Sequence, residues 1–150
     1  MSRRIIFSTL PLIFILLSWS GDTLDTADEI ATANQLIELV NDHRISIGKP
    51  MLIRNSTADI LAAEHTNYMI SKKDVNSDNF ETRLETLEQE ENAQEISENM
   101  GFDLSAEETM YAYLKNSWLK VNVEGDFTHT GIAVKKDAKG NFYYTQIFYR

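Results

Sequence analysis

Between residues 34 and 118 the apolar side chains recur at spacings of three and four, which is the period of a helix that buries one face. Asn55 or Ser56 is placed to cap the second such segment, and Ser105 with Glu108 forms a capping box for the fourth. Residues 21–33 lack this period and are expected to form a leader or linker. The pattern therefore predicts four helices, over residues 34–47, 55–70, 80–87 and 105–118.

The last quarter of the chain changes to the composition of strands. Residues 128–134 and 142–149 are rich in β-branched and aromatic side chains, and the turn residues 139–141 separate the two runs. Two such runs around a short glycine-containing turn predict a β-hairpin. Helices first and a hairpin last predict an α+β domain. The acidic run at residues 88–91 is expected to form an exposed turn.

The first twenty residues have the pattern of a secretory signal peptide. Arg3 and Arg4 precede an apolar run over residues 5–19, and Ser18-Trp19-Ser20 supplies small residues at the positions that a signal peptidase reads. A retained membrane anchor is the alternative, but the run is short for a span and contains Pro11. The predicted organisation is a signal peptide at 1–20, a leader or linker at 21–33 and one domain at 34–150.

Composition and charge exclude several classes of function. The chain carries a formal net charge of -9 and has no basic stripe, so nucleic acid is not an expected partner. It has no cysteine, which excludes disulfides, thiolate metal sites and thiol nucleophiles. The sequence contains neither a Gly-x-Ser-x-Gly nucleophile elbow nor a glycine-rich phosphate loop. No catalytic residue, metal site or cofactor is therefore assigned.

Five short segments, in order along the chain, resemble the CAP superfamily of SCP-like extracellular domains. Residues 36–52 resemble the opening helix of that family and the stop after it, and residues 62–69 resemble its second helix. Ser97-Glu98-Asn99-Met100 resembles the family's Gly-Glu-Asn motif, with serine in the first place. Residues 127–134 and 143–148 resemble the closing hairpin of bacterial members. The resemblance implies an α-β-α sandwich with a central antiparallel sheet.

The resemblance also implies a cavity, which many CAP domains line with two histidines and one or two glutamates that hold zinc or another divalent ion. Glu98 keeps one of these positions, and Asn99 follows it in the motif. The first histidine is expected near Ser77 and the second near Leu119, and Asn116 stands where some members carry a second glutamate. We therefore expect Ser77, Glu98, Asn99 and Asn116 to be the remnant of a degenerate cavity, with no metal.

Three histidines and Glu98 are the remaining candidates for a site. His43, late in the first helix, is expected to face solvent or to pack beside Arg44. His65 on the second helix and His129 at a strand start are expected to have structural roles. A site that joins His65, His129 and Glu98 stays open, although no spacing in the sequence requires it. Glu98 itself is expected to accept hydrogen bonds from backbone N–H groups of a nearby loop.

The resemblance and the replaced cavity histidines together favour a secreted or periplasmic, non-catalytic binding module. Its partner would be a small ligand, an envelope component or a protein. Two alternatives stay open. One is a metal-dependent or hydrolytic CAP protein with a rewired site, and the other is a structural domain whose partner is another envelope protein.

Overall fold

A computed structural model describes residues 21–150, with side chains described from residue 26 onward. The predicted signal peptide at residues 1–20 lies outside the described residues. No helix within residues 21–150 is long and apolar enough to cross a membrane. The described chain forms, in order, α1 (Gly21–Ser46), β1 (Ile53–Arg54), α2 (Ser56–Lys72), α3 (Phe80–Glu91), β2 (Ile96–Phe102), α4 (Ala106–Lys115), α5 (Ser117–Val123), β3 (His129–Lys136) and β4 (Phe142–Tyr149).

The strands form one four-stranded sheet in the order β1-β3-β4-β2. Strand β4 pairs antiparallel with both β3 and β2, whereas the two-residue β1 runs parallel to β3. The predicted hairpin is confirmed, with Gly140 at positive φ in its turn. The sheet is therefore antiparallel at its centre, as expected, and mixed through one short edge strand.

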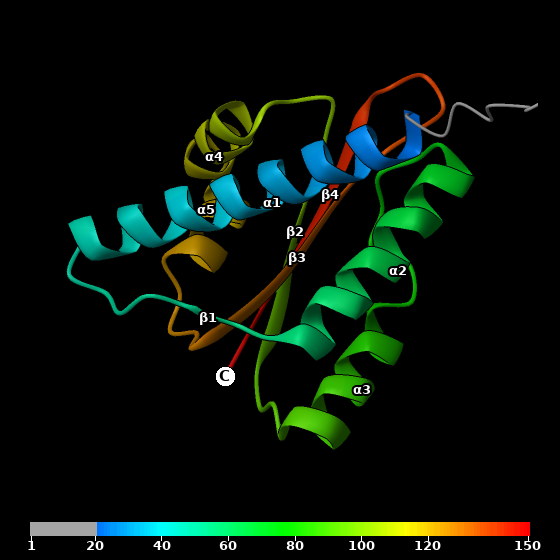
Figure 1. The fold of residues 1–150 in the computed structure, drawn as a ribbon. Coiled ribbons are helices and arrows are strands. Elements are labelled where there is room, and N and C mark those ends of the chain that lie inside the picture. Colours follow the sequence, from blue (N-terminus) through cyan, green and yellow to red (C-terminus); the bar gives the residue numbers. More distant parts are fainter. Residues whose placement is uncertain (1–20) are drawn as a thin grey trace, which may run out of the picture.

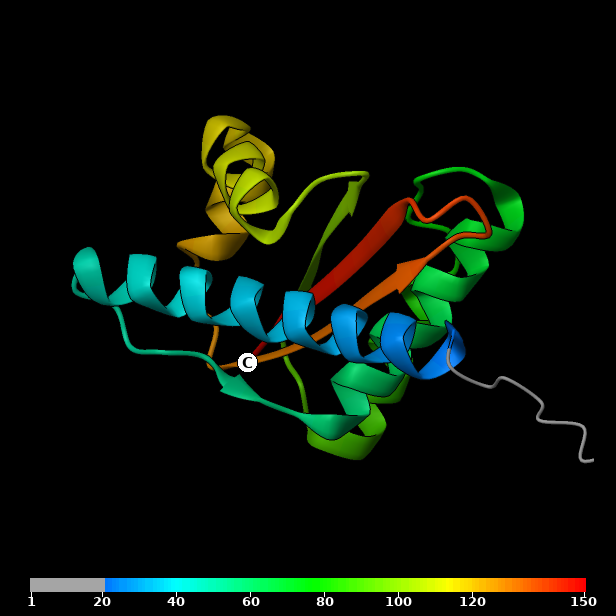
Figure 2. The ribbon, with the colours of Figure 1, turned by 45° about the horizontal axis from the view of Figure 1, so that its top comes forward.

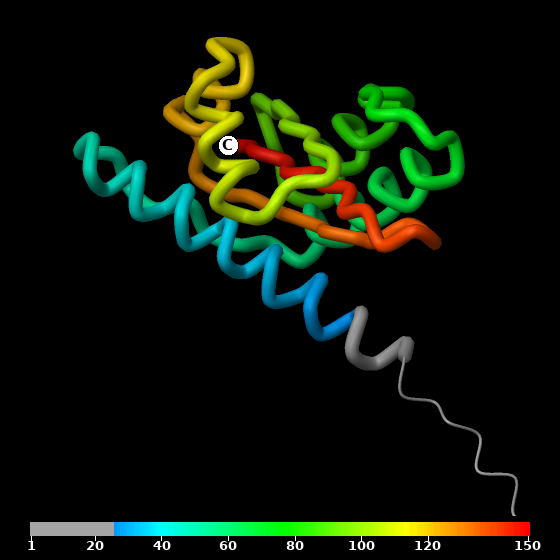
Figure 3. Tube along the Cα trace, turned by 90° about the horizontal axis from the view of Figure 1, so that it is seen from above, coloured from blue at the N-terminus to red at the C-terminus, as the bar shows by residue number. Residues whose placement is uncertain are grey.

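Helices cover both faces of the sheet (Figures 1 and 2). On one face, α1, α4 and α5 pack against Tyr144 and Phe148 of β4. On the other, α2 and α3 pack against Ile147 and Tyr149 of the same strand. Because side chains alternate across a strand, β4 supplies both cores. Viewed from above, the strands run between α1 on one side and α2 and α3 on the other (Figure 3). The α+β class and the α-β-α sandwich are confirmed.

The helix α2 lies close to β3, and Gly131 makes this approach possible. A Cβ atom at position 131 would lie 2.2 Å from the backbone carbonyl carbon of Ala58, a distance that no side chain tolerates. Beside this contact, the backbone N of Ile132 donates to Asp59 Oδ1 at 2.8 Å. These contacts fix α2 on the sheet and so position every residue that α2 presents to α3.

The two predicted helix caps are confirmed. Asn55 caps α2, because its Oδ1 accepts a hydrogen bond from the backbone N of Ala58 at 2.9 Å. Ser105 and Glu108 form the capping box of α4. In each case the cap satisfies a backbone N–H that the first turn of a helix leaves without a partner.

Residues 21–33, which the sequence analysis expected to form a leader or linker, are helical and form the first half of α1. These residues lack an apolar stripe, but polar contacts to the β3–β4 hairpin hold this part of the helix on the domain. Glu29 lies 3.1 Å from Lys135 Nζ and accepts a hydrogen bond from the backbone N of Lys136 at 2.8 Å. Ala33 is buried in the core. Since neither glycine nor proline interrupts residues 22–46, the helix runs unbroken through this segment.

Three further elements differ from the sequence prediction. The acidic residues 88–91 form the last turn of α3, not an exposed turn after it, and Asn92 ends the helix in the left-handed conformation. The predicted fourth helix is divided at Asn116 into α4 and α5. Residues 96–102 form β2, which was not predicted because its polar and apolar residues do not alternate clearly.

Candidate functional site

Arg83 and Glu98 form a buried ion pair between α3 and β2. Arg83 Nε donates to Glu98 Oε1 at 2.5 Å, and Arg83 Nη2 donates to Glu98 Oε2 at 2.8 Å. The Arg83 side chain is 7% exposed and that of Glu98 is 3% exposed. A guanidinium fork matches a carboxylate in this two-bond geometry, and the pair satisfies both oxygens at once. Glu98 therefore has a side-chain partner here, which corrects the expected partnership with backbone N–H groups.

The same guanidinium also holds the loop between α2 and α3. Arg83 Nη1 donates to the backbone oxygen of Asp78 at 2.8 Å. Glu98 lies opposite Ile147 in the β2–β4 register, so the pair sits over the centre of the sheet face that α2 and α3 cover. The arginine thus connects a helix, a strand and a loop through one planar group.

Asn99 lies on the opposite face of the sheet from Glu98, because the two residues are neighbours on a strand. Asn99 is fully buried. Its Nδ2 donates to the backbone oxygen of Leu119 at 3.0 Å, and its Oδ1 accepts from Asn122 Nδ2 at 2.8 Å. Asn99 therefore anchors α5 to β2, and Leu119, which stands at the expected second histidine position, contributes its backbone oxygen to this contact.

Ser77 and Asn116 do not join Glu98 in a common cavity. Ser77 is exposed in the loop before α3, where its backbone oxygen accepts from the backbone N of Phe80 at 3.2 Å. Asn116 is exposed between α4 and α5, and its Oδ1 caps α5 by accepting from the backbone N of Trp118 at 2.9 Å. Of the four expected remnant positions, Glu98 and Asn99 are buried on opposite faces and the other two are at the surface.

The three histidines lie in three different surroundings. His43 Nε2 is 2.8 Å from Glu124 Oε1. His129 stacks on Tyr149 with ring centroids 5.0 Å apart. His65 is buried, and its Nε2 is 2.7 Å from the backbone oxygen of Asn76. Burial, and secondarily the positive charge of Arg83, hold the pKa of His65 below its ordinary value. His65 is therefore neutral at pH 7.

The residues present do not fit a divalent metal ion at the position that the family resemblance implies. A zinc site needs about four nitrogen, oxygen or sulfur ligands. Both oxygens of Glu98 already bind Arg83, and Leu119 offers no side-chain ligand atom. Among residues 26–150, no three histidine, aspartate or glutamate side chains are grouped closely enough to hold a metal ion. The option of a site that joins His65, His129 and Glu98 thus finds no support in the geometry.

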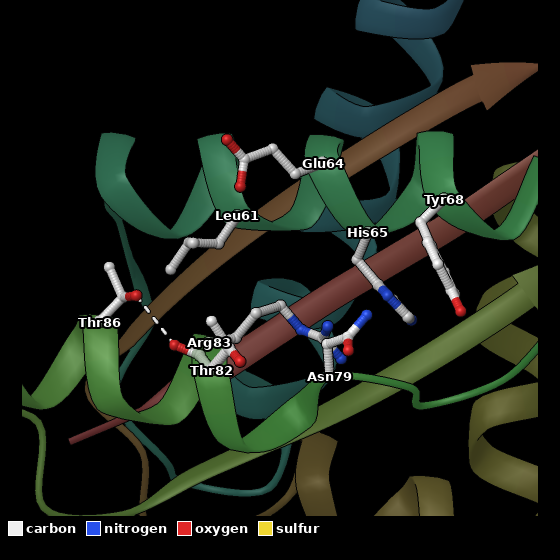
Figure 4. A pocket seen from close by; sticks show the side chains of 8 residues that line it. All are labelled: Leu61, Glu64, His65, Tyr68, Asn79, Thr82, Arg83 and Thr86. Atoms are coloured by element: carbon white, nitrogen blue, oxygen red, sulfur yellow. Dashed lines mark hydrogen bonds between the residues drawn. The ribbon is translucent and has the colours of Figure 1, made fainter.

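A pocket of about 270 Å³ opens between α2 and α3, directly beside the ion pair (Figure 4). His65 and Tyr68 border it from α2, and Thr82 and Arg83 border it from α3. Leu61 adds an apolar wall. The Tyr68 hydroxyl donates to Asp78 Oδ2 at 2.9 Å, and this bond raises the pKa of Tyr68. The pocket therefore combines one apolar wall with several polar groups of fixed orientation.

Arg83 is a site residue that was not predicted from the sequence. Arg83 falls on the apolar face of α3 together with Leu87, and both are buried. An arginine on the buried stripe of a short helix needs a buried partner, since an unpaired charge there is very costly. The position of Arg83 on this stripe could therefore have predicted a carboxylate partner on the sheet. Glu98 was the carboxylate already expected to lie in the cavity.

The chain is similar in sequence or structure to several known proteins. The model of the CAP family, described as the Cysteine-rich secretory protein family, matches residues 37–148. An extracellular protein containing a SCP domain from Bacillus anthracis superposes with a TM-score of 0.75 at 20% identity, covering 95% of this chain and 45% of that one. An outer surface protein from Borrelia burgdorferi superposes with a TM-score of 0.72 at 14% identity, covering 78% and 90%.

A third solved structure is a cysteine-rich secretory protein from Staphylococcus aureus, with a TM-score of 0.64 at 16% identity, covering 81% of this chain and 39% of that one. The chain thus spans less than half of the Bacillus and Staphylococcus proteins. No curated protein matches the chain. At these identities the three structures share the fold alone, whereas the family match extends over most of the sequence. This chain therefore belongs to the CAP family, the Cysteine-rich secretory protein family.

Proposed function

We propose that this chain is a secreted, non-catalytic binding module of the CAP family, in which an arginine replaces a metal ion as the partner of the motif glutamate. The observation that carries the proposal is the buried Arg83–Glu98 pair. Its guanidinium already provides the positive charge that Glu98 needs. A metal ion at Glu98 would have to displace Arg83, and the arginine would then be left buried without its counterion, which costs several kcal/mol.

The pocket beside the pair supports a binding role. It is bordered by groups of fixed orientation, since Arg83 is held by Glu98 and Tyr68 is held by Asp78. Binding sites generally combine an apolar wall with a small number of placed polar groups, which is the composition found between α2 and α3. The partner is therefore expected to be a small ligand, free or as part of an envelope component.

Secretion is supported by the first twenty residues and by the family. Two of the similar structures are described as an outer surface protein and an extracellular protein. We expect the signal segment to be cleaved after Ser20, so that the exported chain begins near Gly21. Mass spectrometry of the periplasmic or extracellular fraction should find this N-terminus, whereas intact Met1 in a membrane fraction would identify a retained anchor.

Metal binding separates a metal-free binding module from a metal-dependent CAP protein. The exported protein is purified, incubated with zinc and then separated from the excess metal. Its zinc content is measured by elemental analysis. Thermal melts are recorded with zinc and with a chelator, because a ligand that binds the folded state raises the melting temperature. We expect no stoichiometric zinc and the same melting temperature in both conditions.

Variants of two glutamates complete this experiment. Glu98→Gln should lower stability equally with and without zinc, since it removes the charge that Arg83 binds. Glu88→Gln changes an exposed glutamate on the same short helix as Arg83 and serves as the matched control. Stoichiometric zinc that stabilises the wild type and Glu88→Gln, but not Glu98→Gln, would contradict the proposed function and establish a rewired metal site.

A further inference from the structure

The outer face of α4 and α5 carries large apolar side chains that the core does not use. Trp118 is 81% exposed and Tyr111 is 64% exposed. The inner face of the same helices already supplies the core, through residues such as Tyr113 and Val123. A helix that is apolar on all sides is generally buried on all sides, and a group of exposed large apolar residues commonly marks an interaction surface. The α4–α5 face is defined here as Tyr111, Lys115, Trp118, Lys120 and Val121.

The charge of this face is opposite in sign to that of the whole chain. Residues 109–123 contain no aspartate or glutamate, although the chain has 23 of these residues and a formal net charge of -9. Lys115 and Lys120 lie in this stretch, and both are exposed. The Lys115 ammonium lies over the Tyr111 ring, 5.2 Å from its centroid. The face therefore presents positive charge next to apolar surface, which is complementary to an anionic partner.

The acidic side chains at the two ends of this stretch already have partners. Glu124 Oε1 is 2.8 Å from His43 Nε2 and 3.7 Å from Lys120 Nζ. Glu108 belongs to the capping box of α4, and Glu107 accepts a hydrogen bond from a side chain of α1. Charges elsewhere on the chain are screened over a length of about 8 Å at physiological ionic strength. The negative charge of the whole chain therefore acts only weakly on a partner at this face.

A lipid bilayer with anionic headgroups matches both properties of the face. Tryptophan and tyrosine are enriched where headgroups meet the hydrocarbon, because their rings are apolar at one end and polar at the other. Lysine side chains near anionic headgroups add a favourable electrostatic contribution. The helices α4 and α5 lie on the side of the molecule away from α2 and α3 (Figures 2 and 3). A membrane at this face would therefore leave the pocket between α2 and α3 open.

We propose that the α4–α5 face binds the surface of an anionic lipid membrane. The rings of Trp118 and Tyr111 would enter the headgroup layer, with Lys115 and Lys120 beside the lipid phosphates. This inference goes beyond the proposed function, because it uses a different side of the molecule and does not depend on the metal content of the protein. The contact is with the membrane surface, as no helix within residues 21–150 is long and apolar enough to span a bilayer.

The test follows the fluorescence of Trp118 as lipid vesicles are added to protein that begins near Gly21. The other tryptophan, Trp19, lies in the predicted signal peptide, so Trp118 is then the only tryptophan in the sample. We expect vesicles of equal parts phosphatidylglycerol and phosphatidylcholine to shift its emission to shorter wavelength and to carry the protein into the pellet on centrifugation. Vesicles of phosphatidylcholine alone should do so far less, and added salt should weaken binding to the anionic vesicles.

Variants of exposed residues connect the response to the face. Lys115→Gln should weaken vesicle binding about fivefold, as the loss of one lysine near an anionic surface does. Lys72→Gln is its matched control, since each lysine lies over a tyrosine ring but Lys72 is on α2. Trp118→Ser should remove most of the pelleting, which is measured without the fluorophore. Ile60→Ser, at an exposed apolar residue of α2, is the control for that variant and should pellet like the wild type.

The possible results are distinct. The absence of binding to anionic vesicles, equal binding to neutral ones, or an equal loss in Lys72→Gln would overturn the membrane inference. A shift of Trp118 emission with soluble polyglutamate but not with vesicles would assign the face to an acidic protein and would also overturn it. A shift with protein concentration alone would do the same, by assigning the face to a second copy of the chain. The zinc measurement tests the proposed function separately, so the two do not fail together.

Discussion

Arg83 on α3 and Glu98 on β2 share two hydrogen bonds across the layer between helix and sheet, with both side chains more than nine-tenths buried. The third hydrogen bond of Arg83, to the backbone oxygen of Asp78, holds the loop before α3 in contact with the pair. Each member of the pair neutralises the other, and little of either side chain is exposed. The stability of the α3 layer therefore depends on keeping both charges or neither.

Removing one member of the pair should be far more harmful than removing both. Arg83→Met leaves the Glu98 carboxylate buried without a counterion, and we expect a loss of about 3–5 kcal/mol in unfolding free energy. The double variant Arg83→Met with Glu98→Met replaces both charges by apolar groups of similar length, and it should recover much of that loss. Urea unfolding of the three proteins measures the coupling. Additive losses in the double variant would mean that the two residues act independently.

The parts of the fold that depend on local signals could be predicted from the sequence. The caps at Asn55 and Ser105 and the hairpin each follow from residues that are close in the chain. The first half of α1 could not be predicted, because its stabilising contacts come from Lys135 and Lys136, over a hundred residues away. Tertiary contacts of this kind stabilise a helix whose sequence lacks a regular spacing of apolar residues.

The candidate site was predictable in part for the same reason. The motif resemblance identified Glu98 and the replaced histidine position at Leu119. It did not identify the partner of Glu98, because pairing with Arg83 requires α3 to lie on a particular face of the sheet. It also gave Ser77 and Asn116 a common cavity that the fold does not form, since each lies in an exposed connection between helices.

Arg44 should be the second critical arginine. It is 1% exposed, and its guanidinium donates to the backbone oxygens of Pro50, Val123, Gly125 and Phe127. Burial lowers the pKa of Arg44, but arginine stays protonated because its ordinary value is so high. Arg44→Lys keeps the charge but loses the planar fork, so several buried carbonyl oxygens lose their donor. We expect a loss of about 2–4 kcal/mol, since each hydrogen bond to a charged group contributes about 1.5–3.

Thermal melts measure this effect, and Arg54→Lys is the control. Arg54 pairs with Asp59 at the surface, where an ion pair contributes about 0–1 kcal/mol. Its replacement should change the melting temperature very little. A similar small change for Arg44→Lys would show that water readily replaces the guanidinium at the four carbonyl groups.

Tyr113 should tolerate the loss of its hydroxyl but not the loss of its ring. It is 1% exposed in the core under α4, and its hydroxyl has no hydrogen-bond partner in the described part of the chain. Burial accordingly raises the pKa of Tyr113 well above its ordinary value. Tyr113→Ala should cost about 3–5 kcal/mol. Tyr113→Phe removes a buried hydroxyl without a partner, so it should be neutral or stabilising in urea unfolding. A large loss in Tyr113→Phe would reveal a buried partner, such as an ordered water.

His65 should make the protein less stable in mild acid. Its pKa in the folded state is lowered, mainly by burial and then by Arg83, with opposing contributions from the Asn76 oxygen, Glu98 and Asp78. In the unfolded chain it titrates near the ordinary value of 6.5. Above that pH both states are neutral, and the stability is fully present. As the pH falls below about 6.5, the unfolded state takes up a proton first, so the unfolding free energy decreases until the lower folded pKa is reached.

The measurement is urea unfolding at a series of pH values from neutral to mildly acidic. Carboxylates also titrate at the acid end, so the quantity that reports His65 is the difference between the wild type and His65→Gln. That difference should change with pH below about 6.5 and be constant above it, because glutamine takes up no proton. His129→Gln keeps His65 and should therefore keep its contribution to the slope. If the wild type and His65→Gln lose stability in parallel, the imidazole accepts its proton as readily in the folded protein as in the unfolded chain. The native state would then not favour the neutral form of His65.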